Sequence, residues 1–284
     1  MRYVIIVLFL LAAGFLFLFR DLIFDIAARL PNIEEIAFNI EASEVKKEVI
    51  APAPLRAKAE SVESFLTDAG VIRLTNIRRS ESDLAPLALN SELTQAAAAK
   101  VQDMFRDQYF AHRSPGGLDA GAFAENNGYE YILIGENLAL GNFRSDAELV
   151  QGWMDSPGHR ANILNSRYQE IGVSTRRGTF EDRTTWLSVQ IFGRPLANCP
   201  RPDESIRVQI ENYDAEIREL REQLELLRTE IQDSSPKNDP AMYNQKVGEF
   251  NALVSQYNQL IEAARNLMTS YNNQVRAFNE CIER

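Results

Sequence analysis

The chain has 284 residues, of which 30 are lysine or arginine and 40 are aspartate or glutamate, so its formal net charge is −10 at pH 7. This length is ample for one or two domains with buried cores. Because an acidic protein repels phosphate groups, we expect no nucleic-acid partner and no attraction of its bulk to an anionic membrane surface.

Residues 1–30 predict a membrane anchor followed by a juxtamembrane helix. Residues 3–19 carry no charged side chain, and as a helix they span roughly 25 Å, close to the minimum for crossing a bilayer. The flanking charges favour an internal N-terminus and an external body. The alternative is a cleaved signal peptide, although no small-residue cleavage site follows the apolar run. We therefore expect a single-pass membrane protein with its C-terminal body outside the cell, or a secreted protein if the segment is cleaved.

Residues 31–61 predict an extracytoplasmic stalk. They mix charged residues, alanine and proline without sustained periodicity. The sequence APAP, residues 51–54, favours an extended polyproline II conformation within it.

Residues 62–197 predict one globular domain that contains both helices and strands. The spacing of apolar residues and the capping residues predict three helices, one over 69–79, one that begins after Asn90 or Ser91, and one that begins at the capping box 145–148. Alternating apolar and polar residues predict antiparallel strands over 168–178 and 184–193. The length suits a single α+β domain.

Residues 198–284 predict two helices with apolar residues at heptad spacing. The first stripe runs from Ile206 to Ile231, the segment 234–240 breaks it, and a second stripe runs from Tyr243 to Ile282. We expect the helices to fold back on each other as an antiparallel coiled-coil hairpin, which could also mediate self-association.

The two cysteines, Cys199 and Cys281, predict a disulfide bond. An exported compartment permits disulfides, and the spacing excludes a C-x-x-C motif. The second helix outruns the first by about 13 residues, roughly 20 Å, which an extended linker after Cys199 can match. A bond that closes so long a loop could stabilise the fold by about 4 kcal/mol.

Three short segments carry the candidate site. The chain has only two histidines. His112 precedes a Ser-Pro-Gly-Gly turn, and Glu136 lies beside a glycine that permits close approach of the backbone. In the third segment, Ser156 can cap a short helix that holds His159 one turn in, with its ring towards the surface.

Together these segments resemble the CAP superfamily, which is named for cysteine-rich secretory proteins, antigen 5 and pathogenesis-related proteins and is also called the SCP domain family. The resemblance is to its bacterial branch and rests on His112, Ser114, Pro115, residues 135–139, Trp153, residues 156–160, 162–164 and 171–173. It implies an α-β-α sandwich with a central antiparallel sheet, and a cleft in which two histidines and acidic residues converge.

By position, the resemblance assigns the histidines of the cleft to His112 and His159 and its first acidic residue to Glu136. Where many members have a second glutamate, this chain has Ser156, with Asp155 beside it. The expected cleft-lining residues are Asp155, Ser156, Asn137, Arg160 and Asn162.

The cleft suggests two kinds of chemistry. Two imidazoles and a carboxylate suit zinc or another divalent metal, with His112 and His159 as ligands. Glu136 could then activate a metal-bound water, which would make the protein a metal-assisted envelope hydrolase of peptide or ester bonds. In a purely structural interpretation, the same three residues form a hydrogen-bonded cluster that holds the loop in place.

We expect the protein to act in binding or recognition at the cell envelope, with a lipid, protein or other envelope component as its ligand, because no activated nucleophile accompanies the histidines. No G-x-S-x-G elbow is present either. The competing hypotheses are the hydrolase and a coiled-coil assembly protein with the globular domain as its head.

Overall fold

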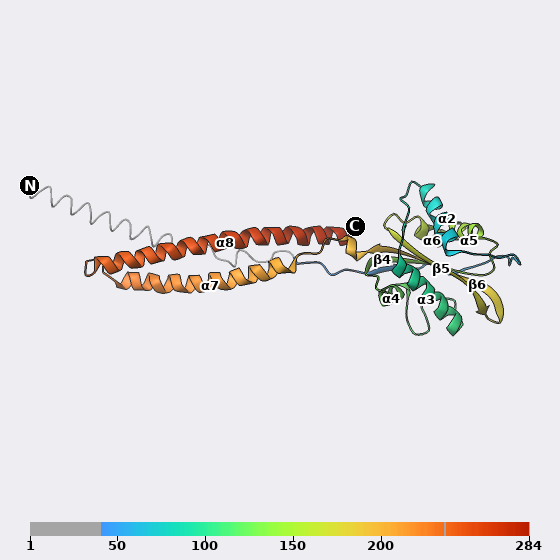
Figure 1. Cartoon of the computed structure of the whole chain (residues 1–284), viewed down its shortest axis with the longest axis horizontal. Coiled ribbons are helices and arrows are strands. Elements are labelled where there is room, and N and C mark those ends of the chain that lie inside the picture. The colour runs from blue at the N-terminus through green and yellow to red at the C-terminus, as the bar shows by residue number, and fades with distance from the viewer. Residues whose placement is uncertain (1–40, 236, 284) are drawn as a thin grey trace, which may run out of the picture. The chain divides into compact units, whose positions relative to one another are not determined.

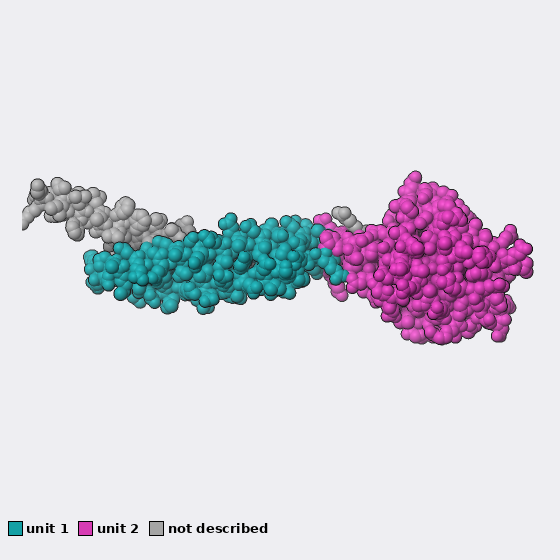
Figure 2. Space-filling model, viewed as in Figure 1, with its two compact units in different colours: residues 1–42, 201–279 teal, residues 43–200, 280–284 magenta. Residues whose placement is uncertain are grey.

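The computed structural model describes residues 41–235 and 237–283, which belong to two compact units (Figure 2). The globular unit comprises Ser43–Pro200 and Glu280–Arg284, and the helical unit comprises Arg201–Asn279 with the residues up to Ala42. The predicted anchor, residues 3–19, and the predicted stalk up to residue 40 lie outside the described residues. Within the described ranges, no helix combines the length and the apolar character needed to cross a bilayer.

The centre of the globular unit is a six-stranded mixed sheet in the order β1-β4-β6-β5-β3, with β2 also paired to β4. The strands are β1 (Glu48–Ile50), β2 (Leu55–Arg56), β3 (Ala88–Leu89), β4 (Tyr131–Leu140), β5 (Glu170–Phe180) and β6 (Arg183–Pro195). Strands β5 and β6 are antiparallel as predicted, and β4, which was not predicted, pairs antiparallel with β6, whereas β1, β2 and β3 run parallel to their neighbours. The purely antiparallel sheet is therefore wrong at its edges, where two- and three-residue strands leave no alternating pattern in the sequence.

Helices cover both faces of this sheet (Figure 1). One face carries α2 (Asp68–Ser80), α5 (Asp146–Asp155) and α6 (Pro157–Ile163), and the other carries α3 (Ser91–Asp107) and α4 (Ala120–Asn126). A buried cluster of helix and strand side chains fills the space on each side of the sheet. The α-β-α sandwich is thereby present, and its two cores hold β4 and β6 between them.

The predicted helix starts are confirmed by their caps. The side chain of Thr67 accepts a hydrogen bond from the backbone of Gly70 at the start of α2, and Asn90 does the same for Leu93 at the start of α3. Ser145 caps α5 by accepting from the backbone of Glu148. These contacts satisfy amide groups that the first turn of a helix leaves without partners.

The segment from residue 43 to residue 61 is part of the globular unit, which corrects the stalk prediction over these residues. Strand β1 pairs with Leu133–Gly135 of β4, and β2 pairs with Ala139 and Leu140. We call residues 47–57 the strap. The strap pairs with residues about 80 positions away in the sequence. Its two prolines are unusual in strands, so the sequence pattern does not predict strands there.

The helical unit contains α7 (Glu204–Asp233) and α8 (Pro240–Glu283). Side chains from both helices form two shared buried clusters, which include Ile210, Ile217, Leu220, Leu224 and Ile231 of α7 and Tyr243, Phe250, Tyr257, Ile261, Ala264, Met268, Tyr271 and Val275 of α8. The predicted apolar stripes are thus buried, while coiled-coil packing and self-association stay predictions. The predicted disulfide is formed between Cys199 and Cys281, which both belong to the globular unit.

Candidate functional site

The candidate site is centred on two neighbouring residues of β4, a strand that is buried along its whole length. Because side chains alternate along a strand, Glu136 and Asn137 point to opposite faces of the sheet. Neither has any exposed surface. A strand that is buried on both faces lacks the alternation of apolar and polar residues from which strands are predicted. The sequence pattern therefore did not predict a strand at Glu136 and Asn137.

His112 forms the polar contact of Glu136 on the α3 side. Its Nδ1 lies 2.5 Å from Glu136 Oε2, and its Nε2 bonds to the carbonyl oxygen of Pro52 in the strap. A carbonyl oxygen only accepts hydrogen bonds, so His112 Nε2 carries a proton. The hydrogen bond between His112 Nδ1 and Glu136 Oε2 then contains one further proton. The Glu136 carboxylate that shares this proton is fully buried. Both ring nitrogens are engaged.

A buried lysine that the sequence analysis did not single out supports this pair. Lys100 on α3 has no exposed surface, and its Nζ donates to the carbonyl oxygen of His112 at 2.8 Å and to the hydroxyl of Tyr109 at 3.2 Å. Burial lowers the pKa of Lys100, and the nearby carboxylates of Glu136 and Asp103 oppose that shift. On an alanine-rich helix a single lysine is typical of a solvent-facing position, so no local signal identifies it.

His159 lies one turn into α6, as predicted, but its ring does not project to the surface. Ser156 is the N-cap residue and Pro157 the first residue of the helix, yet the Ser156 hydroxyl bonds to His159 Nδ1 at 2.8 Å instead of capping the backbone. His159 is 1% exposed. Burial, together with the charge of His112, lowers the pKa of His159 to about 4. His159 is therefore neutral at physiological pH.

This shift predicts a loss of stability in acid. In the unfolded chain His159 titrates near 6.5, so between pH 6.5 and about 4 the unfolded state binds more protons than the folded state. The stabilising contribution is complete above pH 6.5 and declines as the pH falls towards 4, by about 3 kcal/mol. We expect urea unfolding to show this difference between the parent and His159→Gln. Parallel pH profiles for the two proteins would contradict the assignment.

Four amide and hydroxyl side chains continue the site on the α6 side. Asn162 Nδ2 donates to the backbone oxygen of Glu136 and to Asn137 Oδ1, both at 3.1 Å, and Asn162 Oδ1 accepts from Tyr168 at 3.2 Å. Asn137 donates to Gln190 at 3.0 Å. Asn137 and Asn162 were predicted to line the site, whereas Tyr168 and Gln190 were missed; Gln190 reaches Asn137 only through the pairing of β4 and β6.

Three polar residues near the histidines in sequence lie outside this network. Asp155 is exposed and accepts a hydrogen bond from Gln151. Arg160 is exposed on α6, and Arg113 forms an exposed ion pair with Asp119. Asp155 and Arg160 are exposed rather than part of the buried network, and their predicted cleft-lining role stays a prediction.

The donor atoms available to a metal are fewer than the sequence predicts. Glu136 Oε1 and His159 Nε2 are buried and have no hydrogen-bond partner among the described residues. In contrast, His112 Nε2 is hydrogen-bonded to the carbonyl oxygen of Pro52 and is therefore not available as a metal ligand. Within residues 41–235 and 237–283, no three histidine, cysteine or carboxylate side chains are grouped so that they could hold a metal ion. The residues as placed do not fit the predicted metal site, which stays a prediction.

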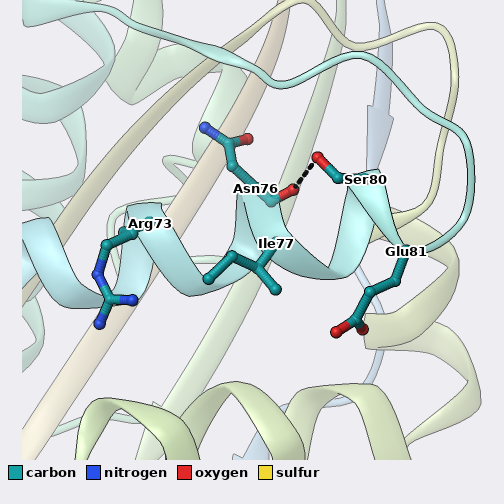
Figure 3. A pocket seen from close by; sticks show the side chains of 5 residues that line it. All are labelled: Arg73, Asn76, Ile77, Ser80 and Glu81. Carbon is teal, nitrogen blue, oxygen red and sulfur yellow. Dashed lines mark hydrogen bonds between the residues drawn. The ribbon is translucent and has the colours of Figure 1, made fainter.

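Two surface depressions lie away from this cluster. One of about 600 Å³ is lined by five residues of α2 or its end, Arg73, Asn76, Ile77, Ser80 and Glu81 (Figure 3). It is open to solvent, and the Ser80 hydroxyl facing it is already bonded to the backbone oxygen of Asn76. We place the functional site at His112, Glu136 and His159, because the predicted motifs meet there and two of the buried side-chain atoms that lack a hydrogen-bond partner among the described residues, Glu136 Oε1 and His159 Nε2, belong to it.

Comparisons with known proteins match part of the globular unit. Residues 72–192 match the sequence model of the cysteine-rich secretory protein family, CAP. The chain is 39% identical over 124 residues to the uncharacterised protein YkwD of Bacillus subtilis, a match that covers 44% of this chain and 46% of that protein. It is 32% identical over 107 residues to the uncharacterised membrane protein YlbC of the same organism, covering 38% of this chain and 31% of YlbC. The chain thus spans less than half the length of these relatives.

Two solved structures are also similar over 44% of the chain. One is an extracellular protein containing an SCP domain from Bacillus anthracis, with 31% identity, a TM-score of 0.39 and 39% of that chain covered. The other is an outer surface protein of Borrelia burgdorferi, with 20% identity, a TM-score of 0.38 and 90% of that chain covered. Residues 72–192, which contain the motifs that build the buried site, therefore carry a CAP domain, and the chain is similar to bacterial proteins over part of its length.

Proposed function

We propose that this protein is an extracytoplasmic binding protein that recognises a component of the cell envelope through the cluster of His112, Glu136 and His159. In this proposal the segment 3–19 holds the protein at the membrane. The observation that carries the proposal is a pair of buried polar atoms, Glu136 Oε1 and His159 Nε2, that have no hydrogen-bond partner in the part of the chain that the structure describes. Each costs about 1–3 kcal/mol while unpaired, so a ligand that supplies hydrogen bonds to them binds with that free energy in its favour.

The same geometry favours binding over catalytic turnover. Ser156 and His159 form a hydrogen bond like that of a nucleophile and its base, but among residues 41–235 and 237–283 no carboxylate orients the other nitrogen of His159. A neutral imidazole with a pKa of about 4 is also a weak base at pH 7. Ser114, the other serine near a histidine, instead accepts a hydrogen bond from the backbone of Leu118 within its turn.

Sedimentation with isolated envelopes of a bacterium that makes the protein tests the proposal. We expect Glu136→Gln and His159→Gln to weaken retention of the fluorescently labelled full chain at least about tenfold, because each substitution alters one of the two unpaired atoms. Asp155→Asn is the matched control, since Asp155 lies in the adjoining segment but is exposed and outside the network.

The outcomes separate the competing functions. Equal retention of all variants would contradict the proposal and direct the search to the helical unit. Release of envelope fragments over time by the parent, but not by Glu136→Gln, would favour the hydrolase instead. Because every variant retains the segment 3–19, attachment through that segment is a common background, which retention on protein-free lipid vesicles measures and which is subtracted before the variants are compared.

A further inference from the structure

The strap lies against the functional site and contacts it with main-chain atoms. The carbonyl oxygen of Pro52 bonds to His112 Nε2, and the carbonyl oxygen of Ile50 accepts a weak hydrogen bond from Asn162 at 3.4 Å. These are alternate residues of an extended segment, and both donors are side chains of the site. The contacts involve backbone oxygens, so they recognise an extended peptide rather than particular side chains.

Pro52 contacts the two histidine-bearing segments at once. While its carbonyl oxygen is bonded to His112, its ring lies against Gly158, the residue before His159. A Cβ atom added at Gly158 would lie 2.6 Å from Cβ of Pro52, and outside the helix of Gly158 the next nearest atom is Cα of Pro52 at 3.7 Å. The absence of a side chain at Gly158 therefore leaves the space that the Pro52 ring occupies.

The strap separates from the sheet at the functional residues. Its ladders with β4 end at Ile50 opposite Gly135 and resume at Leu55 opposite Ala139. Between these points the strap has four residues, 51–54, where β4 has three, 136–138. Two of the four are prolines, which have no N–H to donate to a ladder. The extra residue and the prolines leave Glu136 and Asn137 outside the strap's hydrogen-bond ladder.

The strap is also weakly attached in comparison with the strand beneath it. None of residues 47–57 is buried, whereas every residue of β4 is buried. At its N-terminal end the strap is held by exposed ion pairs from Lys47 to Glu125 and from Glu48 to Arg167. Segments with few buried contacts open at low free energy while the core stays folded.

From these observations we propose that the strap is an intramolecular ligand of the CAP site, and that the ligand the open site takes from outside is an extended, proline-containing peptide. This inference rests on the proposed binding function. Such a peptide would add a strand to the free edge of β4, present one carbonyl oxygen to His112, and place its proline ring against Gly158. The strap lies outside the matched segment 72–192, so it is a feature of this chain rather than of the family match.

A steric substitution with a matching suppressor tests the proposal on the full chain. Gly158→Ala should displace the strap, because the new Cβ would overlap that of Pro52. We expect amide hydrogen exchange in residues 49–57 to accelerate at least about tenfold while β6 keeps its protection. Adding Pro52→Gly removes the overlapping Cβ, so the double variant Pro52→Gly/Gly158→Ala should regain the slow exchange.

A labelled peptide then reports on binding from outside. The probe is a synthetic peptide of residues 45–58 that carries Pro52→Gly, which fits beside an alanine at 158. We expect it to bind Gly158→Ala at least about tenfold more tightly than the parent, in which the tethered strap competes at a millimolar effective concentration. The peptide with its natural Pro52 should not bind Gly158→Ala, and His112→Ala added to Gly158→Ala should abolish binding of the probe.

Two results would overturn the inference. One is unchanged exchange of residues 49–57 in Gly158→Ala, and the other is equal binding of the probe to the parent and to Gly158→Ala. Either would make the strap a permanent edge of the sheet. Neither result bears on envelope retention of Glu136→Gln and His159→Gln, so failure of this inference is distinguishable from failure of the proposed function.

Discussion

Replacing Lys100 with methionine is expected to lower the free energy of unfolding by about 4 kcal/mol, because it removes the positive charge from a buried charged cluster. The Lys100 ammonium is fully buried and donates to His112 and Tyr109. Methionine fills a similar volume but leaves the buried Glu136 carboxylate without this neighbouring charge. Urea unfolding followed by fluorescence is a suitable measurement, since both tryptophans, Trp153 and Trp186, lie in the globular unit.

A double-mutant cycle shows how much of the stability lost in Lys100→Met comes from the interaction of Lys100 with Glu136. In a Glu136→Gln background, Lys100→Met should cost about 1–2 kcal/mol less than in the parent, since the carboxylate that it leaves behind is gone. Lys47→Met is the control, because the Lys47–Glu125 ion pair is exposed and should cost less than about 1 kcal/mol. Equal costs of Lys100→Met in both backgrounds would mean that Lys100 and Glu136 are not coupled.

Removing the disulfide with the pair Cys199→Ser and Cys281→Ser is expected to cost about 4 kcal/mol, because the bond closes a long loop and restricts the unfolded chain. The two cysteines are 82 residues apart in sequence. Thermal or urea unfolding of the parent, with and without a thiol reductant, measures the same quantity without mutation.

The reductant provides the control for this prediction. It should destabilise the parent by the amount that the double substitution costs, and it should leave the substituted protein unchanged. A loss much smaller than about 2 kcal/mol would indicate that α7 and α8, which lie within the loop, stay folded when the globular unit unfolds and already limit the separation of its ends.

The local features of this fold were predictable, whereas the pairing of distant segments was not. Asn90 and Ser145 marked helix starts because a capping side chain bonds within its own helical turn. The motif around His159 likewise predicted α6 from adjacent residues. Strand β4 was missed because both of its faces are buried, so that Glu136 interrupts an apolar run instead of forming an alternating pattern.

The three central residues of the candidate site, His112, Glu136 and His159, were predicted, whereas the residues that contact them, such as Lys100 and Pro52, were not. The three residues that carry its chemistry were found through the motifs of the family, but the direction of the His159 ring was wrong, because the burial of a short helix depends on what packs over it. Lys100 and Pro52 both contact the backbone or ring of His112. Neither shows a sequence signal, since only the folded sheet brings them to this histidine.

The position of the strap in the chain has a mechanical consequence. A pulling force applied to the protein from its N-terminal side reaches the strap before it reaches any buried strand of the sheet. Within the strap, the exposed ion pairs of Lys47 and Glu48 bear the load first, then the short ladder of β1, and then the bond between Pro52 and His112. Tension can therefore uncover His112 while the core stays folded, at a threshold set by a few surface contacts.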